Sequence, residues 1–384
     1  MVTYTTRNKF NIGFESLILY FLLFLTIVFF CVLPMRSENL RHIIVSAGSA
    51  LFYLLAIYRM IKFNYKASHL ALLLVVFFII LFGILLNEDG FKLELFYASA
   101  NFLSFLIILT TERDYSLTAF EKRIINCFVF LNSCIVFILA NSTIAYIFAD
   151  GTSNGSLVLG MTNPNLTGMI LFALFGIVVI FYKQNKTRFI LNVVLFTLFY
   201  FILLTDSRTA LIGTVLLTIY VVLLGNKHIP KLIIIISVFF PLIIVPVYLF
   251  AYNTLPADIM FLDKPLFSGR QMAFQNILEV YNSPSKVLFG DISKYMFANA
   301  TNAAFTVYLS IGVIGVFIVY YLYLKKIILV NTRAQSNSVR IAILCMLSFF
   351  IQSSAESYIF TGAFPGVIYI YIYSLFLLNN GENI

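Results

Sequence analysis

Long apolar runs alternate with short polar connections along the whole chain. Most runs are close to the ~20 residues that a helix needs to cross a bilayer. The pattern predicts spans near residues 16–34, 41–60, 68–87, 92–110, 123–148, 164–182, 188–205, 209–225, 231–251, 303–324, 340–357 and 363–379. We therefore expect an all-α, polytopic membrane bundle of about 12 helices, in one domain over residues 1–384. We interpret the first run as a span that is not cleaved, because it is long and lacks a small-residue cleavage site.

Composition supports a membrane protein and argues against nucleic-acid binding. Hydrophobic residues make up 61% of the chain, the mean hydropathy is +0.98, and only 11% of the residues are charged. The net charge of +9 comes from basic residues in short connections, where they set topology. The four cysteines lie in or beside apolar runs without metal-ligand spacing, so we interpret them as packing residues.

The basic residues gather in alternate connections, which predicts the orientation of the helices. With the N-terminus inside, the cytoplasmic connections contain Arg7, Lys9, Arg59, Lys62, Lys66, Arg113, Lys122, Arg123, Lys183, Lys186, Arg188, Lys227, Lys231, Lys325, Lys326, Arg333 and Arg340. The short outer connections contain only Arg36, Arg41, Lys92 and Arg208. The positive-inside rule then places both termini in the cytoplasm.

Two outer segments, 150–165 and 252–300, are longer than the tight connections elsewhere, and loops of that length are usually functional. In the second, Ser268 and Gln271 have the spacing of a capping box, which predicts a short helix. Arg270 in its first turn opposes the helix dipole, yet an arginine at a helix N-terminus suits an anion. The alternative is a solvated loop arginine.

A second arginine, Arg208, lies between two apolar runs with almost no connection, close to the outer boundary. Ionisable groups at that depth are costly and tend to be functional. Asp206 or Ser207 can cap the following helix, and Asp206 can instead pair with Arg208 as a topological anchor.

Two further motifs flank helix starts. Residues 160–165 read Gly-Met-Thr-Asn-Pro-Asn, in which Thr162 or Asn163 can act as an N-cap with Pro164 in the first turn. Thr301 and Asn302 precede the run that contains Gly312 and Gly315, and glycine pairs in membrane helices indicate close packing.

Several short motifs occur in a fixed order. They are Asn-Pro-Asn at 163–165, Ser-Arg-Thr at 207–209, Ser-Gly-Arg at 268–270, Leu-Phe-Gly at 288–290 and the spacing from Asn302 to Gly315. Together they resemble the O-antigen polymerase and O-antigen ligase superfamily, which includes capsule and exopolysaccharide polymerases. The resemblance covers roughly residues 150–360 and implies a membrane glycosyltransferase of the bacterial cytoplasmic (inner) membrane.

The resemblance also implies the substrates and the site. The substrates would be polyprenyl-pyrophosphate-linked oligosaccharides, and a chain-length regulator is a candidate partner protein besides the bilayer. Phosphate oxygens would be held by Arg208 and Arg270, while other residues would bind substrate: Asn163, Asn165, Asp206, Ser207, Ser268, Thr301 and Asn302. We expect no cofactor, metal or nucleotide sugar.

One departure from the family pattern concerns proton transfer. In ligases a catalytic histidine precedes the residue at position 302, and here that position is Thr301, which favours a polymerase. Threonine cannot act as a general base at neutral pH, so the candidates are Asp206, Asp291 and Glu356. We favour Glu356, near the outer end of an apolar run, as the catalytic base. The alternatives to a polymerase are an O-antigen ligase and a flippase for lipid-linked oligosaccharides.

Overall fold

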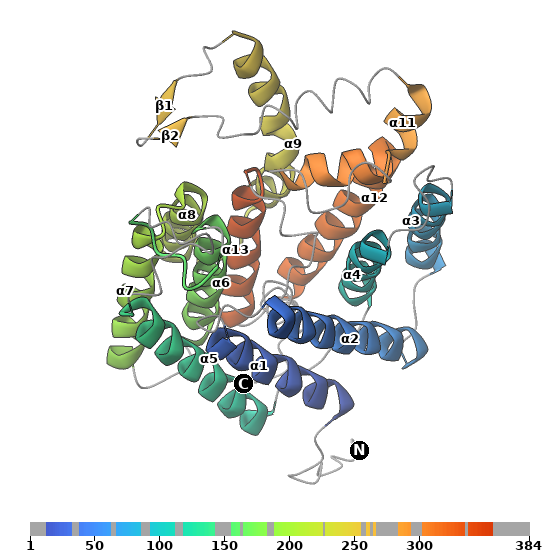
Figure 1. The fold of residues 1–384 in the computed structure, drawn as a ribbon. Helices are drawn as coiled ribbons and strands as arrows, with labels where there is room; N and C mark the ends of the chain where they lie inside the picture. The colour runs from blue at the N-terminus through green and yellow to red at the C-terminus, as the bar shows by residue number, and fades with distance from the viewer. Residues whose placement is uncertain are drawn as a thin grey trace.

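The part of the chain that the structure describes is helical apart from one very short strand pair (Figure 1). The computed structural model describes residues 13–32, 38–62, 67–85, 93–111, 118–142, 155–161, 164–182, 188–225, 227–254, 259–261, 264–265, 283–292, 302–334 and 337–355. The strands β1 (Met260–Phe261) and β2 (Lys264–Pro265) pair antiparallel between α9 and α11.

Every predicted apolar run that falls in the described residues is a helix. The helices are α1 (Phe14–Val32), α2 (Glu38–Lys62), α3 (Ala67–Leu85), α4 (Leu93–Thr110), α5 (Ala119–Ala140), α6 (Pro164–Tyr182), α7 (Arg188–Leu204), α8 (Arg208–Leu224), α9 (Lys231–Thr254), α11 (Pro284–Phe289), α12 (Ala303–Arg333) and α13 (Asn337–Gln352). The predicted run 123–148 ends earlier, at Ala140, and the run that starts at 303 continues to Arg333. The run 363–379 lies outside the described residues.

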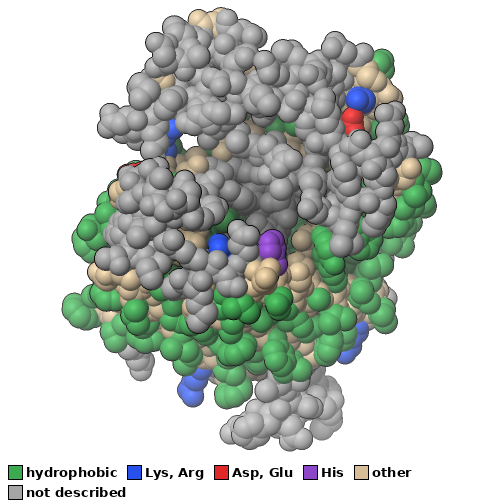
Figure 2. Space-filling model, viewed as in Figure 1, with side chains coloured by type: hydrophobic (Ala, Val, Ile, Leu, Met, Phe, Trp, Pro, Cys, Tyr) green, Lys and Arg blue, Asp and Glu red, His purple; other side chains and the backbone are tan. Residues whose placement is uncertain are grey.

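Five helices in the described residues contain a stretch that is long and apolar enough to cross a membrane. They are α1, α2, α3, α5 and α12. Their neighbours expose large apolar side chains to the surroundings, for example Phe189 and Val222. Figure 2 shows hydrophobic side chains as a broad green band across the described part of the surface in this view. Such a surface is unstable in water and is favourable in lipid.

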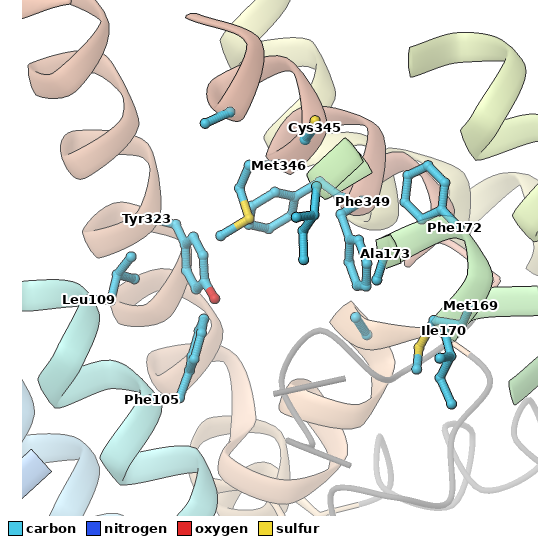
Figure 3. Packing of buried hydrophobic residues seen from close by; sticks show 14 of the residues in the cluster. Phe105, Leu109, Met169, Ile170, Phe172, Ala173, Tyr323, Cys345, Met346 and Phe349 are labelled. Atoms are coloured by element: carbon cyan, nitrogen blue, oxygen red, sulfur yellow. The ribbon is translucent and has the colours of Figure 1, made fainter. Parts of the chain in front are cut away.

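The centre of the bundle is formed by α12 and α13. α13 contacts α6, α8 and α9, while α12 contacts α3, α4 and α9. Aromatic rings fill these interfaces, with ring centroids 5.5 Å apart for Phe172 and Phe349 and 5.6 Å apart for Phe105 and Tyr323 (Figure 3). α13 is buried along most of its length, and close packing of this kind holds the ends of helices in fixed positions, which matters for the site below.

α12 breaks at Gly312 and packs there against the backbone of α11. Gly312 has φ +68° and ψ −172°, and Gly290, which follows α11, has φ +77°. A Cβ atom on Gly312 would overlap the carbonyl of Leu288, and one on Gly290 would lie 2.5 Å from the backbone nitrogen of Ile311. The amide of Asp291 donates to the carbonyl of Leu309 over 2.7 Å. The expected close packing at Gly312 is confirmed, although it occurs at a break in α12 and involves the short helix α11.

Replacing Gly312 by Ala should destabilise the protein, because the new Cβ meets the Leu288 carbonyl and the positive φ is unfavourable for alanine. The backbone contribution alone is about 1 kcal/mol or more. Gly155 is a matched control, since its φ is +75° but a Cβ there has no neighbour within 4 Å. Melting temperatures of both variants in detergent measure the difference. If Gly155→Ala lowers the melting temperature as much as Gly312→Ala, the packing against α11 contributes nothing.

A buried ion pair joins α1, α2 and α4. Nε of Arg59 lies 2.9 Å from Oε1 of Glu15, and the two side chains are only 0% and 3% exposed. Nη1 of Arg59 also donates to the carbonyl of Ile108 over 3.1 Å. Arg59 therefore lies in the last turn of α2 rather than in a connection, and Glu15 neutralises its charge inside the bundle, while the orientation predicted from the basic residues stays a prediction.

A second carboxylate lies at the start of α5. Thr118 and Glu121 form a capping box, in which the backbone nitrogen of Glu121 donates to Oγ1 of Thr118 and the backbone nitrogen of Thr118 donates to Oε2 of Glu121. The hydroxyl of Ser16 on α1 donates to Oε1 of Glu121. α1 is thus fixed to α5 by one polar contact and to α2 by another.

Candidate functional site

The start of α8 is built by the three residues before Arg208. The chain leaves α7 through Thr205 and Asp206, which has a positive φ of +52°. Ser207 is buried and caps α8, because its hydroxyl accepts from the backbone nitrogen of Ala210 over 3.4 Å. Of the two capping residues that the sequence allows, the structure selects Ser207. Arg208 then lies in the first turn of α8 and is half-buried.

The start of α6 lies against the start of α8. Thr167 donates its hydroxyl to the carbonyl of Val158 over 2.8 Å, and Ser156 donates to Oδ2 of Asp206 over 2.6 Å. A Cβ atom on Gly168 would lie 2.6 Å from Cβ of Ser207, so only glycine allows the two helices to approach this closely. Asn165, in the first turn of α6, is half-buried. Segment 155–161 therefore bridges the two helix starts.

The start of α12 is held by Asn302, which is 2% exposed. Its Oδ1 accepts from the backbone nitrogen of Phe305 over 3.0 Å, and its Nδ2 donates to the carbonyls of Pro241 and Ser354 over 3.1 and 2.7 Å. Both amide hydrogens are thus used within the protein, so Asn302 positions the helix start and has no hydrogen left for a ligand. The backbone nitrogen of Ala303 donates to the carbonyl of Ser353 over 2.9 Å.

These contacts bring three helix starts together around the last turn of α13. The α6 start touches the α8 start through Gly168, and the α12 start is bonded to residues just after α13. α13 packs on α8 at Gly213. A Cβ atom added to Gly213 would lie 3.5 Å from Cβ of Gln352. We call the region formed by the starts of α6, α8 and α12 and the end of α13 the helix junction.

The helix junction contains three helix N-termini and one guanidinium. A helix N-terminus carries about half a positive charge and presents backbone nitrogens without helical partners. Three such ends and the guanidinium of Arg208 contribute positive charge to the helix junction, while the C-terminal end of α13 and the carboxylate of Asp206 contribute negative charge. Arg208 and Asn302 were predicted from the sequence as site residues, and the structure brings their helix starts to the same region.

Gln352 is a polar residue at the junction to which the sequence analysis assigned no role. Its side chain is 4% exposed, and neither its amide nitrogen nor its amide oxygen has a hydrogen-bond partner. Buried amides without partners are rare and costly, which marks this position as a candidate for ligand or water binding. A glutamine inside an otherwise apolar run was the only signal in the sequence.

The remaining predicted residues divide into two groups. Asp291 pairs with Lys286 of α11, with Oδ2 and Nζ 2.7 Å apart, so its contact supports the docking of α11 on α12. Six other candidates lie outside the described residues: Asn163, Ser268, Arg270, Thr301, Glu356 and the cap candidate Thr162.

The part of the chain that the structure describes contains no group of three or more His, Cys, Asp or Glu residues able to hold a metal ion. The four cysteines carry free thiols, and Sγ of Cys345 contacts the carbonyl of Gly176 at 3.6 Å.

In the described residues the fold is a helical bundle with five candidate membrane spans, in which the starts of α6, α8 and α12 lie around the end of α13. Comparison of the chain with protein-family models, with curated proteins and with solved structures gives no match.

Proposed function

We propose that this protein is a polysaccharide polymerase that transfers a growing glycan from a polyprenyl-pyrophosphate carrier to a lipid-linked repeat unit. In this proposal the chain spans the bacterial cytoplasmic membrane about 12 times, with both termini inside. The helix junction and the segment between α9 and α12 then face outward. Substrates with a lipid carrier are already outside the cell membrane, so no nucleotide sugar is required.

The observation that carries the proposal is the meeting of three helix starts with Arg208. A pyrophosphate leaving group gains negative charge as its bond to the sugar breaks, and fixed positive dipoles stabilise that charge without reorganising. A guanidinium adds bidentate contacts to phosphate oxygens that an ammonium cannot reproduce. The long segment 255–302 follows α9 and precedes α12 in the chain.

The proposed reaction forms one glycosidic bond and breaks one sugar–phosphate bond. A hydroxyl at the non-reducing end of the acceptor repeat attacks the anomeric carbon of the growing chain, and polyprenyl pyrophosphate departs with the electron pair. Arg208 and Arg270 hold the departing pyrophosphate, and Glu356 accepts the hydroxyl proton. Asn302 acts by fixing the start of α12, while Asn163, Asn165, Asp206, Ser207, Ser268 and Thr301 line the substrate site.

The purified protein in detergent, given lipid-linked repeat units from the strain that encodes it, should produce a ladder of longer lipid-linked glycans. Each new glycosidic bond should release one polyprenyl pyrophosphate, which can be measured separately. Because two lipid-linked units react with each other, no lipid A acceptor should be needed. Product formed only when lipid A is supplied would identify a ligase and reject the polymerase.

A transporter of the same lipid-linked substrates is the second candidate. The observation that favours it is the buried pair of Arg59 and Glu15, because charges inside a membrane bundle often line a transport path. Proteoliposomes distinguish the two functions: a transporter moves the lipid-linked repeat across the bilayer without lengthening it, whereas a polymerase lengthens repeats that are already on the outer side.

A further inference from the structure

Buried polar atoms lie near the C-terminal end of α13. Within the described ranges, neither the amide nitrogen nor the amide oxygen of Gln352 has a hydrogen-bond partner, and the side chain is 4% exposed. The hydroxyl of Ser348, four residues earlier, is fully buried and is likewise unpaired among the described residues. Other buried helical serines behave differently, since Ser133 and Ser310 donate to the carbonyls four residues before them, over 2.8 and 2.6 Å. Unpaired polar groups in an apolar interior are costly, so these atoms call for a partner.

The unpaired groups share one face of α13, and a small space adjoins that face. Ser348 and Gln352 are four positions apart, which places their Cβ atoms about 5–6 Å from each other. On α8, a Cβ atom added to Gly213 would lie 3.5 Å from Cβ of Gln352 and 3.4 Å from Cε2 of Phe172. Both are ordinary van der Waals distances, in contrast to the 2.6 Å overlap at Gly168. Gly213 therefore leaves room for about one methyl group, which is comparable to one water molecule.

We propose that an ordered water molecule occupies this space between α8 and α13, bonded to the amide of Gln352 and to the hydroxyl of Ser348. The three unpaired atoms supply both donors and acceptors, as a buried water needs. Two hydrogen bonds of about 2.8 Å each, made through one water, span the separation of neighbouring side chains on a helix face. The inference does not depend on the proposed function, because it rests on burial, on unpaired polar atoms and on free space.

A double-mutant cycle tests whether the space at Gly213 holds a water that Gln352 requires. Gly213→Ala fills the space with a methyl group, and Gln352→Met removes the amide but keeps an unbranched side chain of similar length. With Gln352 present, the methyl group displaces the water and leaves the amide unpaired. In the Gln352→Met background no amide depends on the water. The change in melting temperature caused by Gly213→Ala should therefore be less favourable by roughly 3 °C when Gln352 is present.

The four proteins of the cycle are compared as the purified full chain in detergent. Alanine has a higher helix propensity than glycine, but this gain is present in both backgrounds and cancels in the comparison. Lys62→Met, at the exposed end of α2, is the control background, in which Gly213→Ala should change the melting temperature as it does in the wild-type protein. Equal changes in the wild-type and Gln352→Met backgrounds would overturn the proposal.

Radiolytic hydroxyl-radical labelling of the wild-type protein covers the case in which a variant does not fold. Radicals formed from a bound water modify the side chains beside it even when those side chains are buried. Phe172, which is 1% exposed and lies beside Gly213, should therefore be modified more than Phe30, which is 0% exposed. Gly213→Ala should reduce the modification of Phe172 to the level of Phe30. Equal modification of the two rings in the wild-type protein would show that the space is dry and would reject the water site.

Discussion

Replacing Arg208 by Ala should lower the rate of polymerisation on the order of a hundredfold while the protein still accumulates and folds. Arg208 is half-buried in the first turn of α8, where its guanidinium adds to the positive ends of three helices. Loss of a charge-assisted phosphate contact costs a few kcal/mol, which accounts for a rate change of that size. The rate is measured as release of polyprenyl pyrophosphate from purified lipid-linked repeats.

Two control variants distinguish the effect of the guanidinium geometry on the rate from the effect of its charge and from a general loss of folded protein. Arg208→Lys keeps the charge but loses the bidentate geometry, so it should restore little of the activity. Arg340→Ala removes a positive charge at the start of α13, far along the helix from the junction, and should leave the rate unchanged. Arg270→Ala should reproduce the loss seen for Arg208→Ala if both arginines hold pyrophosphate. Full-length polymer made by both alanine variants would eliminate the anion site as a catalytic element.

Replacing Arg59 by Met should lower the free energy of unfolding by about 3–5 kcal/mol, because it leaves the carboxylate of Glu15 buried without its partner. For a chain of this size the melting temperature should fall by roughly 5 °C. A thiol-reactive dye reports the transition in a background in which Cys31, Cys127 and Cys134 are replaced by Ser, since Cys345 is buried in α13 and becomes reactive only when the bundle opens.

The double variant Glu15→Leu with Arg59→Met tests the pairing itself. Removing both charges leaves an apolar interface, so the double variant should melt well above Arg59→Met, since apolar replacement of a whole buried pair is often neutral. Lys62→Met, at the exposed end of the same helix, is the control and should melt like the wild-type protein. A double variant as unstable as the sum of the two single variants would show that Arg59 and Glu15 act independently.

The sequence by itself determined where the helices lie. The bilayer demands apolar runs of a fixed length, so each run in the described residues became a helix, most of them within a few residues of the predicted bounds. The exceptions are the C-terminal ends of α5, at Ala140, and of α12, at Arg333. The match is closest for α6, which begins at Pro164 as predicted, because proline is favoured in the first turn of a helix. The sequence also allowed Ser207 to be predicted as an N-cap, since the capping hydrogen bond joins residues only three positions apart.

The tertiary structure alone decided which of these local features meet. Arg59 is 44 positions from Glu15, and the helix starts at Gly168, Ser207 and Asn302 converge only because specific faces of α6, α8, α12 and α13 pack together. The break at Gly312 and the unpaired amide of Gln352 follow from the same packing. Hydrophobic periodicity shows that one face of a helix is buried, but it does not show which other helix packs against that face. Pairing between distant helices depends on shape and close contact in three dimensions, which no local pattern in the chain records.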